Sequence, residues 1–271
     1  MPMYNTMILS YVTFGYFFAF FLYLLMVVMK RDIFGSIASY ISLASLLLHT
    51  AGIIIRWLES HRLGIGHAPL SNLYESLIFF GWSIMLLYMI LEWRTKIRTF
   101  GPFVTPIAFL IMAYASFSPS INTRIQPLIP ALKSNWLIAH VITCFIGYAA
   151  FGISMALSIV YLLNKKGKIT DILEELNYQM IVIGFLMLSM GIITGSVWAH
   201  YAWGSYWSWD PKETWSLITW LIYAALIHSR MVRGWKGRRI AFLSIIGFSC
   251  VLFTYFGVNF LLSGLHSYAK S

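Results

Sequence analysis

Eight apolar stretches, each near the length that crosses a lipid bilayer, dominate this sequence of 271 residues. A membrane-spanning helix needs about 20 consecutive, mostly apolar residues. The stretches cover residues 7–29, 37–55, 73–91, 100–117, 137–163, 179–197, 214–229 and 240–262. They predict an all-α integral membrane protein with about eight transmembrane helices. We expect these helices to form a single polytopic membrane domain over residues 1–271.

The composition excludes the other broad classes of protein. Hydrophobic residues make up 59% of the chain and charged residues only 10%, against about 25% charged residues in a soluble domain. Too few polar side chains remain to coat a soluble fold, and the hydrophobicity is too high for a disordered chain. The two cysteines lie far apart, which excludes a disulfide scaffold and a CxxC redox or zinc site.

The formal net charge of +10 would indicate nucleic-acid binding in a soluble protein. Of the 19 basic residues, however, 13 follow the first, third, fifth and seventh apolar stretches: Lys30, Arg31, Arg94, Lys96, Arg98, Lys165, Lys166, Lys168, Arg230, Arg233, Lys236, Arg238 and Arg239. The positive-inside rule then predicts that the N-terminus and the C-terminus both face the periplasmic or lumenal side. The charge therefore reports membrane topology, and no nucleic-acid partner is expected.

The predicted outer side carries four segments, residues 56–72, 118–135, 198–210 and 264–271. The connections on the other side are too short to hold a soluble catalytic domain. We therefore expect a functional site at the outer surface of the membrane, among these four segments.

Residues 195–220 hold six of the eleven tryptophans: Trp198, Trp203, Trp207, Trp209, Trp215 and Trp220. Tryptophan at the headgroup level is usual in membrane proteins, which accounts for two or three of the six. It does not account for four of them within the twelve residues 198–209. Clustered planar rings suit a flat apolar ligand, because they give stacking area with little rotamer entropy to lose. We name residues 198–215 the tryptophan loop and predict that it binds such a ligand.

The motif Asp210-Pro211-Lys212-Glu213 predicts the start of the next helix, since Asp at the N-cap, Pro at N1 and Glu at N3 form a capping box. This structural role also fixes the tryptophan loop against a helix N-terminus. Such a terminus, with Lys212 beside it, favours an anion such as a carboxylate. A porphyrin with its propionates fits a planar apolar ligand with acidic edges, and a quinone fits it less well.

Haem iron is commonly held by axial histidine, and the chain has seven histidines: His49, His61, His67, His140, His200, His228 and His266. His140 lies one turn inside the outer end of a predicted helix, where the helix N-terminus favours the neutral ring that a metal requires. An interfacial histidine bonded to water or backbone is the alternative, and position alone favours it. His266 follows the predicted C-cap Gly264 and is either a second ligand flanking the tryptophan loop or a tail residue.

His228 ends the seventh apolar stretch on the predicted cytoplasmic side. A histidine at a helix C-terminus interacts favourably with the helix dipole, but an ionisable residue at membrane depth is also a candidate for function. A structural role is favoured for His49, His61 and His200.

Polar residues of the first outer segment have structural interpretations as well. Asn72 and Glu75 have the spacing of a capping box that opens a helix. Arg56 and Arg62 are candidates to meet propionates, and they are equally suited to pair with Glu59 or with lipid phosphate.

Four runs of the sequence resemble one family of haem-handling membrane proteins. The run WGSYWSWDPKETW (203–215) is similar to the WWD signature of cytochrome c maturation proteins. GHAPLSNLYES (66–76), HVITCFIGYAA (140–150) and FGVNFLLSGLHSY (256–268) are similar to the CcsA family, also called ResC, of the System II pathway. The resemblance extends from about residue 56 to the C-terminus. CcmC lacks the PLSNLYES segment, and CcmF is much longer.

The resemblance implies a function and a set of site residues. With its membrane partner CcsB (ResB), a CcsA protein moves haem b across the membrane and presents it to the CxxCH motif of apocytochrome c, where thioethers form. The family's two outer axial histidines map to His140 and His266, and its membrane-embedded histidine, which pairs with one from CcsB, maps to His228. The WWD segment maps to the tryptophan loop, including Trp198, Trp203, Trp207, Trp209, Asp210 and Trp215. No role follows for His67.

The chain is then expected to be one subunit of a cytochrome c synthase. The implied location is the bacterial cytoplasmic membrane with a periplasmic active face, or the thylakoid membrane for a plastid-encoded chain. A haem transporter or chaperone without catalysis, similar to CcmC, shares every residue named above and stays open. A b-type electron-transfer cytochrome is less well supported, because His140 and His266 lie at helix ends and not at mid-membrane.

Overall fold

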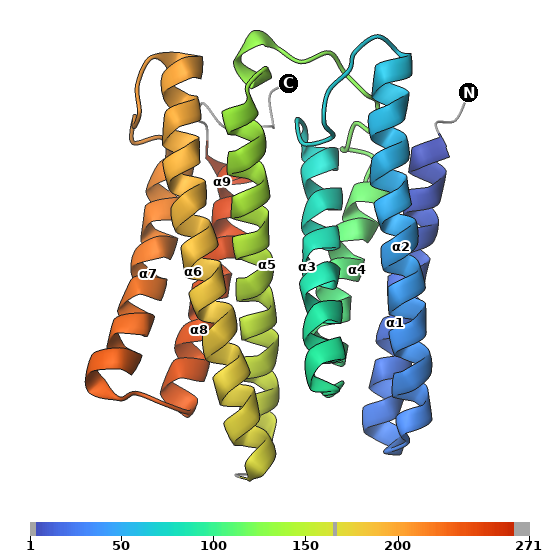
Figure 1. Cartoon of the computed structure of the whole chain (residues 1–271), viewed down its shortest axis with the longest axis vertical. Helices are drawn as coiled ribbons and strands as arrows, with labels where there is room; N and C mark the ends of the chain where they lie inside the picture. The colour runs from blue at the N-terminus through green and yellow to red at the C-terminus, as the bar shows by residue number, and fades with distance from the viewer. Residues whose placement is uncertain (1–3, 165–166, 263–271) are drawn as a thin grey trace. The chain divides into compact units, whose positions relative to one another are not determined.

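The computed structural model describes residues 4–164 and 167–262, and all regular structure within these ranges is helical (Figure 1). The elements in chain order are α1 (Tyr4–Met29), α2 (Asp32–Arg62), α3 (Leu73–Thr95), α4 (Gly101–Phe117), η1 (Pro130–Leu132), α5 (Asn135–Leu163), α6 (Lys168–Trp203), α7 (Pro211–Arg233), α8 (Arg238–Leu252), η2 (Phe253–Gly257) and α9 (Val258–Leu261). The short element η1 is a 3-10 turn. The element η2 is a π-helix that joins α8 to α9.

The predicted all-α membrane fold is confirmed. Each of the eight apolar stretches coincides with one helix of the structure, the last with the continuous helix α8–η2–α9. Within the described residues, six helices are long and apolar enough to cross a membrane. Helix α4 is apolar but shorter, at 17 residues. Helix α7 is less apolar, because Lys212 and Glu213 lie in its first turn and Arg230 and Arg233 lie in its last turn.

The ends of α6 differ most from the prediction. Its first turns are polar and lie before the apolar stretch, and Glu174 in this part accepts a hydrogen bond from Arg230 of α7 (3.2 Å). At the other end, Trp198 and Trp203 lie inside the helix and not in a loop, which corrects the predicted outer segment 198–210. The helix ends at Gly204, whose left-handed backbone (φ 80°) and N–H···O bond to His200 (2.8 Å) form the C-cap.

The chain divides into two compact units, Met1–Ile129 and Pro130–Ser271. In unit 1, α1 packs against α2 and α4, and α3 packs against α4 and α2. Buried and half-buried polar residues join these helices near the α3–α4 connection, where Tyr23 donates to Glu92 (2.6 Å) and Arg98 donates to Ser39 of α2 (3.0 Å). The α1–α2 and α3–α4 connections therefore lie at the same end of unit 1. The single-domain assignment stays a prediction.

In unit 2, α5 and α6 form a closely packed pair, with α8 against α5 and α7 against α6 and α8. Glycines permit the close approach: a Cβ on Gly147 would lie 3.1 Å from the carbonyl oxygen of Gly184. The ring of Phe151 in α5 stacks on Tyr223 in α7, with centroids 3.5 Å apart. Ser154 donates to Asn177 (2.6 Å) inside the α5–α6 pair, so the buried polar groups there are satisfied.

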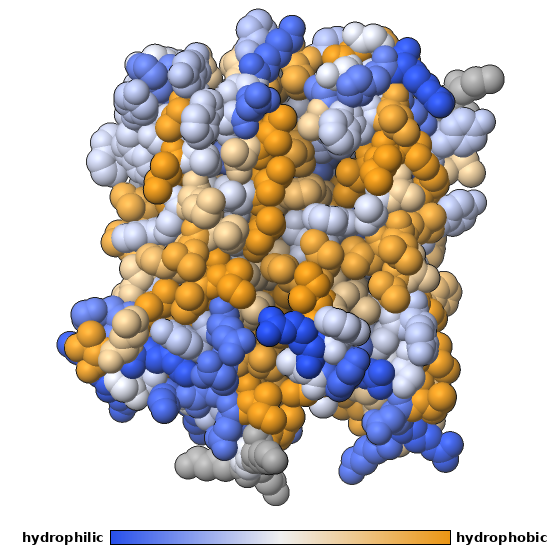
Figure 2. Space-filling view, in the orientation of Figure 1, coloured by the Kyte–Doolittle hydropathy of each residue, from blue (hydrophilic) through white to orange (hydrophobic). Residues whose placement is uncertain are grey.

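Apolar side chains cover the middle of the helices, and hydrophilic side chains gather at the helix ends (Figure 2). Large apolar residues on this exterior include Phe18 at 55% exposure and Leu110 at 62%. A lipid bilayer covers such a surface, whereas water would leave it a strongly destabilising patch. The protein is therefore a membrane protein. The side of the membrane that each end faces stays a prediction.

Candidate functional site

His140 lies near the start of α5, as predicted, in a helix whose N-cap Ser134 accepts a hydrogen bond from the Trp136 amide (3.2 Å). The Nδ1 atom of His140 lies 2.7 Å from the carbonyl oxygen of Gly191 in α6. A carbonyl can only accept, so Nδ1 carries a proton, and in the neutral ring the lone pair is on Nε2. Metal-binding histidines commonly donate their other N–H to a carbonyl or carboxylate in this way.

Two glycines of α6 make room for His140 and for Cys144, one turn further along α5. A Cβ on Gly195 would lie 2.7 Å from Cε1 of His140, and a Cβ on Gly191 would lie 3.3 Å from the backbone nitrogen of Cys144. Real Cβ atoms do not approach closer than about 3.0 Å. Gly191 and Gly195 form a GxxxG motif, the small-residue pattern of close helix pairs in membranes. The sequence analysis did not single out these two residues, although the GxxxG motif is present in the sequence.

Trp198 follows the two glycines on the same face of α6. Its ring lies nearly parallel to that of His140, with 16° between the planes and 6.1 Å between the centroids. Its indole N–H donates to the carbonyl of Ala131 (2.8 Å), and its ring contacts Trp203 at 4.7 Å. Only 4% of Trp198 is exposed. It therefore supports the imidazole and holds η1 against α6.

The rest of the tryptophan loop is more open. Trp209 is 68% exposed, and its ring meets that of Trp207 edge to face at 5.7 Å. Trp209 has a left-handed backbone (φ 59°), which is rare for a bulky residue and costs of order 1–3 kcal/mol. His200 stacks on Tyr206 at 4.2 Å, in keeping with its expected structural role. The loop thus presents the exposed indole of Trp209, whose backbone is strained, beside the indole of Trp207.

The predicted capping box of α7 is present. Asp210 accepts a hydrogen bond from the Lys212 amide (2.9 Å), and Glu213 accepts one from the Asp210 amide (3.2 Å). Glu213 also accepts one from the Ser208 amide (2.7 Å). Both carboxylates are buried. Their role is to hold the loop on the N-terminus of α7, as the sequence indicated.

Lys212 lies in the first turn of α7, ahead of the apolar stretch 214–229. Its ammonium donates to the side-chain oxygen of Asn259 in α9 (2.8 Å). Burial lowers the pKa of Lys212 to about 8, and the charge of Asp210 offsets part of this effect. The Lys212 side chain is half-buried in unit 2, at the end that carries the tryptophan loop.

The remaining predicted site residues lie apart from this group. Trp215 faces the π-helix, where its ring contacts Phe253 at 4.2 Å. His228 is exposed on α7, about 25 Å along the helix from Pro211 at a rise of about 1.5 Å per residue. His266 lies outside the described residues, so the structure brings together His140, Trp198 and Trp203 but does not test the second axial ligand.

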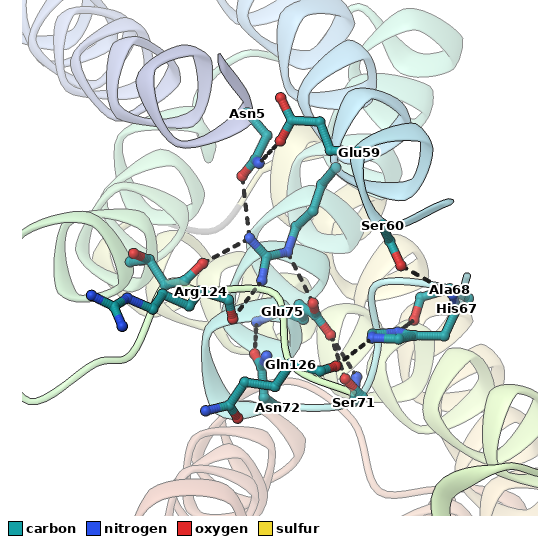
Figure 3. Close-up of polar contacts among 12 residues, drawn as sticks. Asn5, Glu59, Ser60, His67, Ala68, Ser71, Asn72, Glu75, Arg124 and Gln126 are labelled. Atoms are coloured by element: carbon teal, nitrogen blue, oxygen red, sulfur yellow. Dashed lines mark hydrogen bonds and ion pairs between the residues drawn. The ribbon is translucent and has the colours of Figure 1, made fainter. Parts of the chain in front are cut away.

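Unit 1 contains a buried ionic cluster that sequence reasoning did not find (Figure 3). Arg56, only 1% exposed, donates to Glu75 (2.9 Å), to Asn5 (3.2 Å) and to the carbonyl oxygens of Thr123 (2.9 Å) and Arg124 (3.4 Å). The sequence left three candidate partners for Arg56: propionates, Glu59 or lipid phosphate. The structure instead pairs it with Glu75, and its guanidinium is engaged with protein acceptors. Arg56 therefore organises unit 1.

Two other histidines have structural roles. Both ring nitrogens of His67 face backbone carbonyls, of Ala68 (2.8 Å) and Gln126 (3.0 Å), so the ring joins two connections of unit 1 (Figure 3). His49 in α2 lies 3.0 Å from the hydroxyl of Tyr16 in α1, an interhelical contact in keeping with the structural role favoured for it. With both nitrogens of His67 turned to carbonyls, neither is available to a metal.

Comparison with known proteins defines the class. A family model described as cytochrome C assembly protein matches residues 70–266. Its all-helical membrane fold and this match together show that the chain is a cytochrome c assembly protein. The chain is 39% identical to the cytochrome c biogenesis protein CcsA of Parasynechococcus marenigrum (strain WH8102), with 86% of each chain covered. It is 41% identical to CcsA of Guillardia theta, covering 84% of this chain and 85% of that one.

CcsA of Chlamydomonas reinhardtii is 43% identical, covering 80% of this chain and 64% of the longer relative. The chain belongs to the CcsA family of cytochrome c biogenesis proteins, as its sequence motifs predict. Its structure is also similar to that of the cytochrome c heme lyase CcmF, with a TM-score of 0.74 and 19% identity. That match covers 96% of this chain and 46% of CcmF, so the fold matches part of a larger protein.

Proposed function

We propose that the protein binds haem b at its outer face and, with CcsB, presents it to the CxxCH motif of apocytochrome c. His140 and His266 are the proposed axial ligands of the iron. The observation that carries this function is the bond from Nδ1 of His140 to the carbonyl of Gly191 (2.7 Å). It places the proton of the neutral ring on Nδ1 and leaves the lone pair on Nε2, the atom that would ligate iron.

The surroundings of His140 suit a flat apolar cargo. Trp198 supports the imidazole from one side, and Trp203 contacts Trp198 at 4.7 Å. Trp207 and the exposed Trp209 supply further ring surface on the same loop. Aromatic rings bind a porphyrin through area and offset stacking, with little entropy to lose. The residues present therefore fit the proposed cargo.

Bound haem b supplies the vinyl groups to which the two cysteine thiols of CxxCH add. The protein contributes position: His140 and the tryptophan loop hold the cargo at one place while the substrate peptide approaches. Such positioning removes much of the entropic part of a barrier. His140 also keeps its proton on Nδ1, directed at Gly191, so that proton takes no part in ligation.

His228 has a separate proposed role in delivering haem from the other side. It is exposed on α7, about 25 Å from the loop end of that helix. An exposed histidine in an apolar helix surface is suited to share a ligand with a second chain, and CcsB is the proposed source of the second histidine. The proposed membrane is a bacterial cytoplasmic membrane or a thylakoid membrane, with the tryptophan loop on the periplasmic or lumenal face.

Co-expression tests the function. The chain, CcsB and a CxxCH-containing apocytochrome are produced together, and covalent haem on the apocytochrome is measured by haem stain and mass. We expect covalent haem with the wild-type chain, none with His140→Gly and a normal amount with His61→Gly, an exposed histidine outside the tryptophan loop. Free bound haem with no covalent product from the wild-type complex would instead identify a haem carrier.

A further inference from the structure

A shallow cavity of about 330 Å³ lies at the end of unit 2 where α5 begins. The residues that line it belong to η1, to the connection from η1 into α5 and to the last turn of α6: Pro130, Ala131, Lys133, Ser134, Trp136 and Tyr201. None of these six is among the residues proposed to hold haem. The cavity is therefore a candidate site for a different ligand.

The polar side chains that line the cavity can all donate hydrogen bonds. The ammonium of Lys133 is a donor with a full charge, and the indole of Trp136 and the hydroxyl of Tyr201 are neutral donors. Ser134 accepts from the Trp136 amide (3.2 Å), which leaves its hydroxyl proton available. Lys133 is exposed and forms no ion pair with any of the described residues. One cation among three neutral donors suits an anionic group with several acceptor oxygens, such as a phosphate.

An exposed apolar stripe on α6 starts at this cavity. Ile193, Met190 and Leu186 precede Tyr201 by 8, 11 and 15 residues, spacings that place all four side chains on one face of the helix. The three apolar residues are 64%, 49% and 54% exposed. At a rise of about 1.5 Å per residue, the stripe is about 22 Å long, which exceeds the roughly 15 Å depth of one hydrocarbon leaflet. An acyl chain can therefore lie along it.

We propose that the cavity binds the phosphate headgroup of an anionic phospholipid, while an acyl chain of the same molecule lies along the α6 stripe. An amphiphile uses both features at once, whereas a peptide at the membrane surface would use only the cavity. Tryptophan and tyrosine are the residues that proteins place at headgroup level, as Trp136 and Tyr201 are here. A zwitterionic headgroup brings its own cation close to Lys133, so an anionic lipid is preferred.

The bound lipid would also brace the support of His140. Ala131 lines the cavity, and its carbonyl accepts a hydrogen bond from the indole N–H of Trp198 (2.8 Å). Trp198 in turn lies nearly parallel to the His140 ring, with 16° between the planes. A headgroup that holds η1 in place therefore holds the acceptor to which Trp198 is tied. Lipid binding itself does not depend on the proposed function, so either can fail without the other.

Photolabelling tests the site on the purified full-length chain in a non-ionic detergent. The probe is phosphatidylglycerol with a photoreactive group on an acyl chain, and the label within residues 186–201 is measured by peptide mass spectrometry. We expect unlabelled phosphatidylglycerol to displace the probe at about tenfold lower concentration than phosphatidylcholine with the same acyl chains. Inorganic phosphate should displace it poorly, because it lacks the acyl chain. Lys133→Met should lower the label about tenfold, and Lys133→Arg should retain it.

Lys236→Met is the matched control, since this exposed lysine lies beyond α7 at the other end of the helices. It should label like the wild type within residues 186–201. Equal displacement by the two phospholipids, a measurement that needs no variant, would overturn the proposal. Equal label in Lys133→Met and the wild type would overturn it as well. Displacement by a CxxCH peptide at lower concentration than by phosphatidylglycerol would identify a peptide site in place of a lipid site.

Discussion

The Nδ1 atom of His140 in α5 lies 2.7 Å from the carbonyl oxygen of Gly191 in α6. This single bond sets the tautomer of the imidazole and ties its direction to the packing of two helices. The ring fits only because Gly195 leaves the space that it occupies, and Gly191 leaves space for the neighbouring Cys144. A change that keeps His140 but moves its ring should therefore impair the site as severely as removing it.

Gly195→Ala is expected to impair haem binding while His140 is retained. The new methyl would lie 2.7 Å from Cε1 of His140, so the ring must move and its bond to Gly191 is lost. We expect at least a tenfold weaker haem affinity by absorbance titration, with a loss of stability of about 1–3 kcal/mol from overpacking. In Gly167→Ala the methyl meets no described atom within 4 Å. Equal haem affinities for Gly195→Ala and Gly167→Ala would contradict the claim that Gly195 leaves the space for the His140 ring.

Trp209→Asn is expected to lower haem affinity without lowering the stability of the fold. Asparagine adopts the left-handed backbone that Trp209 has (φ 59°) more readily than tryptophan does. The exposed indole makes little contact with the core, so we expect the thermal unfolding temperature to stay equal or rise. Haem affinity should fall, because a stacking surface is lost. Unchanged affinity would show that the exposed indole has no part in the site.

Arg56→Met is expected to destabilise unit 1 without changing the haem site of unit 2. It leaves the buried carboxylate of Glu75 without its cation, and breaking a buried pair typically costs about 3–5 kcal/mol. Denaturant unfolding in detergent measures this loss. Arg124→Met is the matched control, since that side chain is exposed and should change stability by less than about 0.5 kcal/mol. Similar stabilities for both variants would contradict the role assigned to the cluster.

His228→Ala should reduce cytochrome c yield in cells and leave the purified protein stable. The side chain is exposed on α7, so its removal opens no cavity, and a stability change below about 0.5 kcal/mol is expected. Haem added from outside should still bind at His140. Normal cytochrome c maturation in a strain that carries His228→Ala would remove the reason for assigning it a role.

The sequence was sufficient for the helices because apolar length alone specifies a membrane span. It failed at the ends of α6, where helix continues through polar turns that pair with Arg230 and through Trp198 and Trp203 up to Gly204. Hydropathy records where a helix meets lipid and not where its hydrogen bonds stop. The capping box at Asp210 was predictable, because its partners are near neighbours in sequence.

The contacts that organise the site join distant residues, and no local pattern specifies them. Arg56 meets Glu75 across two helices, which their positions in the sequence did not indicate. Asn259 contacts Lys212 because the π-helix Phe253–Gly257 rotates α9, and the sequence of these five residues does not predict a π-helix. The GxxxG motif at Gly191 and Gly195 can be recognised in the sequence. Its contact with His140 is seen only in the structure, where α5 packs against α6.

The most direct measurement is the absorption spectrum of haem-loaded protein carrying His140→Gly, recorded with and without added imidazole. The account predicts that the variant loses the six-coordinate low-spin spectrum of the wild-type protein and regains it when imidazole fills the space left by the ring. His61→Gly, at an exposed histidine outside the tryptophan loop, should keep the wild-type spectrum throughout. A six-coordinate low-spin spectrum from His140→Gly without imidazole would show that His140 does not ligate the iron.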